Sequence, residues 1–228
     1  MNNIGSAFSF PFKDPDWLSK FLLGTLFSFL SLLLIGIPVT CGYYVELLQR
    51  VRRGEQYPLP EWKDVGVKFV VGIKYLALTI IYHLPILLVL IPVILMMMAT
   101  MFALGGSDIT GFFMAPYFIV IFVLVVPYAL FINLLMPIIS IEFSEQESIG
   151  QGLRVGNVFA IFKRHWQDAL IATLITIGIS SLVGLGLLAF IIGLFTATFY
   201  VHLVSFHLYG QIAQAMDNST SVPTERKQ

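Results

Sequence analysis

The sequence predicts an all-α, polytopic transmembrane helical bundle of about six spans with one amphipathic surface helix. Of the 228 residues, 57% are hydrophobic and 11% are charged, whereas a soluble domain carries about 25% charged residues. No charged side chain occurs in residues 21–45, 75–107, 109–141 or 169–216, runs of 25, 33, 33 and 48 residues. Because one bilayer crossing takes about 20 apolar residues, the lipid bilayer is the expected environment of these runs.

The first apolar run divides into two expected helices. Pro15 begins the first, over residues 15–35, because proline suits the first helical position. A glycine and a proline at positions 36 and 38 interrupt it, and the second helix covers residues 39–53. One straight helix over residues 17–53 would reach about 55 Å, so a hairpin is expected here.

The two middle runs are expected to be long helices with kinks at their prolines. The first covers residues 60–104 with prolines at 85 and 92, and the second follows a loop at 105–111 and ends near residue 143. Each internal proline removes a backbone donor and clashes with the preceding turn. Neighbouring helices can bond the freed carbonyls in a membrane.

The last part of the chain is expected to hold a surface helix and two further spans. Residues 147–166 mix apolar and basic side chains, which is typical of a helix lying along the membrane surface. Residues 168–216 are too long for one crossing, and the Gly184–Gly186 segment is the expected break. One helical domain over residues 1–216 is predicted, with a disordered polar tail over residues 217–228.

The distribution of basic residues predicts the topology. With six spans, all thirteen Lys and Arg residues lie on one side, and the 105–111 loop on the other side carries Asp108 and no basic residue. Basic residues stay cytoplasmic, so both termini are expected in the cytoplasm, with the chain in the inner (plasma) membrane. Five spans would give a split of eleven to two, and eight spans result if both proline-bearing segments fold back.

The three tryptophans each precede an apolar segment. Trp17, Trp62 and Trp166 are therefore predicted to be interfacial anchors, because indole prefers the level of the lipid headgroups. Two of them lie in similar pieces of sequence, Pro-Asp-Trp at 15–17 and Pro-Glu-Trp at 60–62.

These two tryptophan segments carry a family resemblance. The sequences FPFKDPDW at 10–17 and GEQYPLPEW at 54–62 resemble domain-of-unknown-function family 4013, a family of prokaryotic integral membrane proteins without an assigned activity. The resemblance extends over most of residues 8–213, mainly as hydrophobic pattern. It implies a membrane protein of bacterial or archaeal origin and supplies no catalytic residues.

Glu46 is the most interesting ionisable residue because it lies within the second expected span. Acids inside a membrane are costly and often functional. Arg50 stands four residues later, so an interfacial ion pair at helical spacing is the commoner explanation. Glu46 is therefore a weak candidate for a site.

Four further polar residues lie in expected spans: His83, Asn133, His202 and His207. Histidine is a common metal ligand, but His202 and His207 are five residues apart and lie on different faces of a helix. Asn133 has an ordinary alternative use in bonding between helices. No metal and no cofactor is expected.

A non-enzymatic membrane component is the favoured function: a scaffold, an accessory subunit or a membrane organiser. Its partners would be a second copy or other subunits of a membrane complex, and the zero net charge gives no sign of nucleic-acid binding. A transporter or channel for a small solute or lipid is the alternative, since broken helices build midplane sites. An enzyme is not expected, because no nucleophile elbow, carboxylate pair or Walker loop is present.

Overall fold

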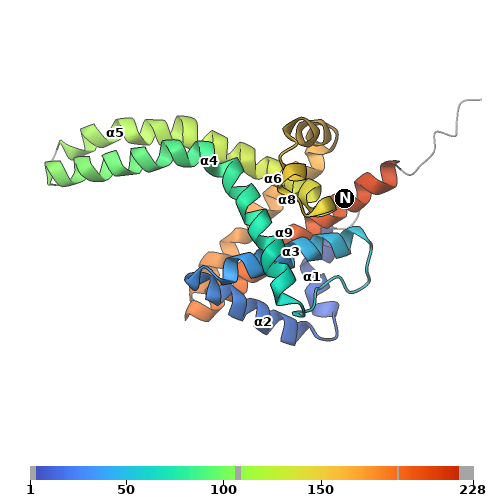
Figure 1. Ribbon diagram of the computed structural model, residues 1–228. Helices are drawn as coiled ribbons and strands as arrows, with labels where there is room; N and C mark the ends of the chain where they lie inside the picture. Colours follow the sequence, from blue (N-terminus) through green and yellow to red (C-terminus); the bar gives the residue numbers. More distant parts are fainter. Residues whose placement is uncertain (1–3, 106–108, 189, 221–228) are drawn as a thin grey trace, which may run out of the picture. The chain divides into compact units, whose positions relative to one another are not determined.

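The protein is helical throughout the described part of the chain. The computed structural model describes residues 4–105, 109–188 and 190–220 and has no β-strand among them (Figure 1). The predicted all-α class is therefore confirmed. The helices are α1 (Ile4–Ser9), α2 (Trp17–Leu30), α3 (Gly36–Arg52), α4 (Val65–Leu104), α5 (Thr110–Val120), α6 (Val126–Gln146), α7 (Ile149–Gly152), α8 (Val155–Leu188) and α9 (Phe190–Thr220). Three short segments join them: the 3-10 turns η1 (Phe10–Lys13) and η2 (Ser31–Leu33), and the π-helical η3 (Ile121–Val125).

The chain divides into two compact units. Unit 1 comprises Met1–Leu78 and Leu135–Gln228, and unit 2 comprises Thr79–Leu134. The single domain over residues 1–216 stays a prediction. The helix α9 continues to Thr220, four residues into the segment predicted as a disordered tail. Residues 221–228 of that predicted tail lie outside the described residues.

The core of unit 1 forms where α3 and α9 pack together, with α2 and α8 on either side. Tyr43, Leu47 and Leu48 of α3 and Phe199 and Leu203 of α9 are all fully buried. Two glycines allow this close packing. A Cβ at Gly24 would lie 2.1 Å from the ring of Phe199, and one at Gly210 would lie 2.5 Å from Val51.

The α2–η2–α3 hairpin has the predicted course but turns two residues earlier than expected. Leu34 takes the left-handed conformation that closes the turn, with φ 62°. Gly36 instead begins α3. A Cβ there would lie 2.1 Å from the carbonyl oxygen of Phe27, so the close approach of α2 and α3 at this turn requires a glycine. The helix α2 begins at Trp17 and not at Pro15, since the preceding Asp14 carboxylate accepts the Asp16 amide at 2.8 Å.

The helices α3 and α4 cross at backbone contact. A Cβ at Gly42 would lie 1.9 Å from the carbonyl oxygen of Lys68, and one at Gly72 would lie 1.7 Å from that of Pro38. The helix α4 begins at Val65, five residues later than predicted, because Pro60 lies in a buried part of the loop and its carbonyl accepts the Tyr43 hydroxyl at 2.9 Å.

Unit 2 is a hairpin of two long helical arms, which Figure 1 shows side by side in green. The first arm is the continuation of α4, which passes through Pro85 and Pro92 as one 40-residue helix. The second arm is α5, η3 and the start of α6, also unbroken. Neither arm folds back at its prolines, so the eight-span alternative finds no support. In the predicted 105–111 loop, residues 106–108, Asp108 among them, lie outside the described residues.

The predicted surface helix over residues 147–166 is helical but interrupted. It comprises α7 and the first part of α8, which bends at His165, where φ is −120° and ψ is 22°. The break expected at Gly184–Gly186 is not present there, because α8 continues through these residues to Leu188; α9 begins at Phe190, and Ala189 lies outside the described residues. Gly186 serves close packing, because a Cβ there would lie 2.5 Å from the carbonyl oxygen of Gly193 on α9.

Four helical segments are long and apolar enough to cross a membrane, and a fifth candidate arises if one bent pair counts as a span. The four are Val65–Leu104, Thr110–Gln146, Val155–Leu188 and Ile192–Ser219, and the bent pair joins Ile4–Lys13 to Trp17–Leu33. The prediction of a polytopic membrane protein is supported by these lengths, whereas the six-span count is not confirmed. The shortfall lies in α2 and α3, which have only 14 and 17 residues.

Candidate functional site

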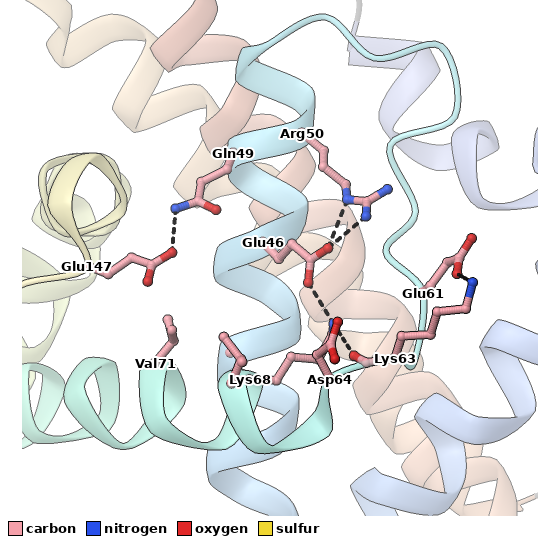
Figure 2. A pocket seen from close by; sticks show the side chains of 11 residues that line it. Glu46, Gln49, Arg50, Glu61, Lys63, Asp64, Lys68, Val71 and Glu147 are labelled. Atoms are coloured by element: carbon pink, nitrogen blue, oxygen red, sulfur yellow. Dashed lines mark hydrogen bonds and ion pairs between the residues drawn. The ribbon is translucent and has the colours of Figure 1, made fainter.

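A polar pocket of about 330 Å³ lies in unit 1, where α3 faces the start of α4. We call it the Glu46 pocket (Figure 2). Its lining is Gly42, Glu46, Gln49, Arg50, Glu61, Lys63, Asp64, Val67, Lys68, Val71 and Glu147. The volume falls within the range of sites for small ligands.

Glu46 is the centre of an ion-pair network between two helices. One of its oxygens lies 2.8 Å from Nη2 of Arg50, one turn along α3, and the other lies 2.7 Å from Nζ of Lys68 on α4. Figure 2 shows the carboxylate between the two bases. Nζ of Lys68 also donates to the carbonyl oxygen of Lys63 at 2.9 Å. Lys68 is 6% exposed, and these partners offset the cost of burying its side chain.

Glu147 enters the pocket from the segment between α6 and α7. Its Oε1 accepts a hydrogen bond from Nε2 of Gln49 at 3.0 Å, and the same nitrogen donates to the carbonyl oxygen of Ser144 at 2.9 Å. The side-chain amide of Gln49, an uncharged donor, thus holds the carboxylate of Glu147 in place. Glu147 and Asp64 both have a positive φ, 50° and 53°, which non-glycine residues adopt rarely.

The loop from Gly54 to Asp64 forms one wall of the pocket and is fastened to α2 and α3. The indole of Trp62 stacks between Phe27 and Tyr43, with ring centroids 4.7 Å and 4.2 Å away. Its Nε1 donates to the carbonyl oxygen of Lys20 at 2.8 Å, and Nζ of Lys20 donates to that of Leu59 at 3.0 Å. These contacts fix the loop that carries the remaining pocket residues.

The outer end of this loop carries an exposed ion pair, Glu61 with Lys63. Their side chains are 49% and 80% exposed. The hydrogen bond from Lys63 holds the pKa of the Glu61 carboxyl below its ordinary value. Both residues lie at the mouth of the pocket.

Among the residues predicted from the sequence, only Glu46 lies in this pocket. The predicted ion pair with Arg50 is present, and Lys68 is a second partner that the sequence analysis did not identify. His83, Asn133, His202 and His207 do not converge on it. His83 and His202 each donate Nδ1–H to the carbonyl four residues earlier, Thr79 and Thr198, both at 2.8 Å.

The other two polar candidates are also engaged in local bonds. Nδ2 of Asn133 donates to the carbonyl oxygen of Ala129 at 2.8 Å. His207 stacks on Phe10 with centroids 4.2 Å apart, and its Nδ1 accepts from Nε2 of Gln211 at 3.2 Å. Within the described residues, no group of three or more His, Cys, Asp or Glu side chains could hold a metal ion.

The three tryptophans have different surroundings. Trp62 lies in the aromatic stack described above, whereas Trp166 is 47% exposed just after the bend at His165. Trp17 makes edge contacts with Phe12 and Phe21, at 5.4 and 6.5 Å. Their role as interfacial anchors stays a prediction.

Sequence reasoning missed a second polar cluster, at the end of α6. Glu142 is 2% exposed and accepts from Nδ2 of Asn157 at 2.7 Å. Nearby, Arg52 binds both oxygens of Asp217 at 2.7 Å and Glu145 at 3.1 Å, which joins α3, α6 and α9. Glu142 follows the buried Leu135 and Ile138 at helical spacing, and this periodicity was the signal for its burial.

Comparison with known proteins gives one match. The family model described as "Protein of unknown function (DUF4013)" matches residues 26–194, well over half of the chain. No curated protein and no solved structure matches the chain. The matched range contains Glu46, Lys68 and Glu147, and it excludes most of α9.

Proposed function

The chain belongs to the DUF4013 family of proteins of unknown function, and we propose that it is a non-enzymatic membrane component, which serves as a scaffold or accessory subunit of a membrane complex. The observation that carries the proposal is the hairpin of unit 2. Its arms expose large apolar side chains on all sides: Phe102 is 92% exposed, Phe112 79% and Phe122 71%. Two helices have no interior, so this surface is suited to packing against lipid and other transmembrane helices.

The length of the two arms supports their place in a bilayer. Residues 79–104 and 110–134 would reach about 39 Å and 37 Å as helices, against a hydrocarbon core of about 30 Å. Bonds between the arms hold them together. Tyr128 donates to the carbonyl oxygen of Tyr82 at 2.9 Å, and the hydroxyls of Thr100 and Tyr117 lie 2.9 Å apart.

The proposal includes a topology of six crossings with both termini in the cytoplasm of a cell with an inner membrane. The α2–η2–α3 hairpin supplies the first two. Phe29, near the end of α2, contacts Phe195, near the start of α9, at a centroid distance of 5.4 Å. Thr25 and Thr196 lie 3.3 Å apart at the same level. The end of α2 and the start of α9 therefore lie at the same end of unit 1. If α8 and α9 cross the bilayer, the turn at Leu34 reaches the membrane face at which α9 begins.

Photo-crosslinking from the hairpin tests the scaffold role. A photoreactive amino acid at position 112 should give crosslinks to a second protein chain, whether another copy or a different subunit. The matched control places the same group at position 138, where Ile138 is fully buried in unit 1, and should give only intramolecular products. Crosslinks to lipid alone from positions 102, 112 and 122 would contradict the proposal.

The alternative, a transporter or channel for a small solute or lipid, is supported by one local feature of unit 2. An apolar hollow of about 260 Å³ lies beside Pro85, Val89, Val125 and Tyr128, next to the π-helical η3. Proline and π segments loosen a helix where ligands bind. Flux of a lipid or solute in proteoliposomes that is lost on Val125→Trp would favour this alternative, and the absence of such flux with the wild type would remove it.

A further inference from the structure

We propose that the first part of α8, residues 155–164, binds the anionic phospholipids of the membrane surface. We call these residues the surface segment. The proposal rests on the crossing of the bilayer by α8, which is part of the proposed topology, and it is independent of the scaffold role. The length and bend of α8, the orientation of the surface segment and the charges on it support the proposal.

The helix α8 is longer than one crossing, and its bend divides it. It has 34 residues, which would reach about 51 Å in a straight helix, against a hydrocarbon core of about 30 Å. The backbone leaves the helical conformation at His165, and residues 166–188 alone would reach about 35 Å. The part after the bend is therefore long enough to cross, and the surface segment is left at the level of the headgroups.

Contacts within unit 1 fix which side of the surface segment faces outward. Val158 is 1% exposed, and Nδ2 of Asn157 donates to the buried Glu142 at 2.7 Å. Val155, in contrast, is 51% exposed, and the half-buried Phe162 lies two turns further along the same face. The outward side thus carries apolar side chains, which is typical of a helix that lies in a membrane surface.

The bases of the surface segment have no acid beside them in the sequence. Residues 148–167 contain Arg154, Lys163 and Arg164 and no Asp or Glu. Lys163 and Arg164 are exposed, and neither forms an ion pair with an acid that the structure describes. By contrast, the exposed Arg53 and Lys63 each pair with a nearby acid. Anionic headgroups supply the missing negative charge, since they attract Lys and Arg next to a transmembrane helix.

Lipid-specific quenching of Trp166 tests the proposal, because Trp166 directly follows the bend and is 47% exposed. The full chain with Trp17→Phe and Trp62→Phe is reconstituted in mixed phosphatidylcholine and phosphatidylglycerol, with one or the other lipid brominated at a series of mole fractions. The binding constant at Trp166 should be about fivefold higher for phosphatidylglycerol, the factor that one base gives beside an anionic surface. Spin-labelled forms of the two lipids give the same comparison for a protein that keeps all three tryptophans.

The Lys163→Gln/Arg164→Gln variant should bind the two lipids about equally, because the bases that attract the anionic headgroup are gone. The matched control is Arg53→Gln/Lys63→Gln, which removes the same charge from exposed side chains of another loop and should keep the preference. Equal binding of the two lipids by the chain with its bases intact would overturn the proposal in favour of an acidic protein partner. An equal loss of preference in the control would also overturn it. Quenching by neither lipid would overturn the crossing of α8 as well.

Discussion

Lys68 and Glu46 join α3 to α4 through one ion pair, and the effect of its removal depends on which partner is left. Glu46→Gln leaves the ammonium of Lys68, 6% exposed, without a carboxylate. We expect a loss of about 2 kcal/mol, less than the 3–5 kcal/mol for a fully buried pair, because Glu46 is partly exposed. Unfolding in mixed SDS micelles measures it. The Glu46→Gln/Lys68→Met variant should recover part of the loss, and a double variant as unstable as the sum of both single changes would argue against the pair.

Trp62 and Trp166 should respond differently to quenchers in the lipid. Trp62 lies between Phe27 and Tyr43, whereas Trp166 is 47% exposed. Brominated lipids should therefore quench a variant that retains only Trp166 more strongly than one that retains only Trp62. Fluorescence in liposomes measures this. Equal quenching would show that lipid reaches Trp62 as easily as Trp166, and it would contradict the enclosure of Trp62 between the two rings.

Sequence reasoning found Glu46 but not the pocket around it, for a physical reason. The Arg50 pair follows from helical spacing within α3, whereas Lys68 is 22 positions away and its approach depends on how α3 and α4 cross. The buried face of α4 at Lys68, Val71, Gly72 and Tyr75 has helical periodicity, so the burial of Lys68 was predictable even though its partner was not. Glu147 joins the pocket only through tertiary packing.

At the scale of elements, the crossing of α3 and α4 depends on two glycines. Gly72→Ala should destabilise the protein by about 3 kcal/mol, at the upper end of the usual cost of overpacking, because a Cβ there would lie 1.7 Å from the backbone carbonyl of Pro38 and the helices would have to separate. The matched control is Gly66→Ala, also in α4, where nothing lies within 4 Å of an added Cβ. It should be neutral or stabilising by up to about 1 kcal/mol. Unfolding in SDS micelles compares the two, and equal effects would contradict a close crossing.

Existence and type of the elements were predictable from the apolar runs, but their ends were not. The long helices at 65–104 and 110–146 follow from composition. Their prolines at 85, 92 and 137 lie inside helices that are not interrupted, and the kinks expected at them stay a prediction. The break between α8 and α9 is predicted at Gly184–Gly186, but α8 continues through these residues, and Gly186 allows the close approach of Gly193. A glycine alone does not tell a turn from a packing contact.

At the scale of the whole molecule, composition predicted a membrane protein. The number of times the chain crosses the membrane depends on whether each helix is long enough to span the bilayer. The apolar runs gave six segments, of which α2 and α3 fall short of a single crossing by length. The helix α2 together with η2 reaches about 27 Å, and α3 reaches about 26 Å. Both lengths are close to the thickness of the hydrocarbon core, about 30 Å. A slightly thinned bilayer accommodates such a pair.

Cysteine accessibility at the tip of this hairpin tests the account most directly. In a Cys41→Ser background, Leu34→Cys places one thiol at the turn of the hairpin, and Lys63→Cys places one in the loop between α3 and α4; both wild-type side chains are exposed. With a membrane-impermeant maleimide on intact cells, the six-crossing account predicts labelling at position 34 before permeabilisation and at position 63 only afterwards. Labelling of both positions only after permeabilisation, or no labelling of position 34 in either state, would show that the hairpin does not cross.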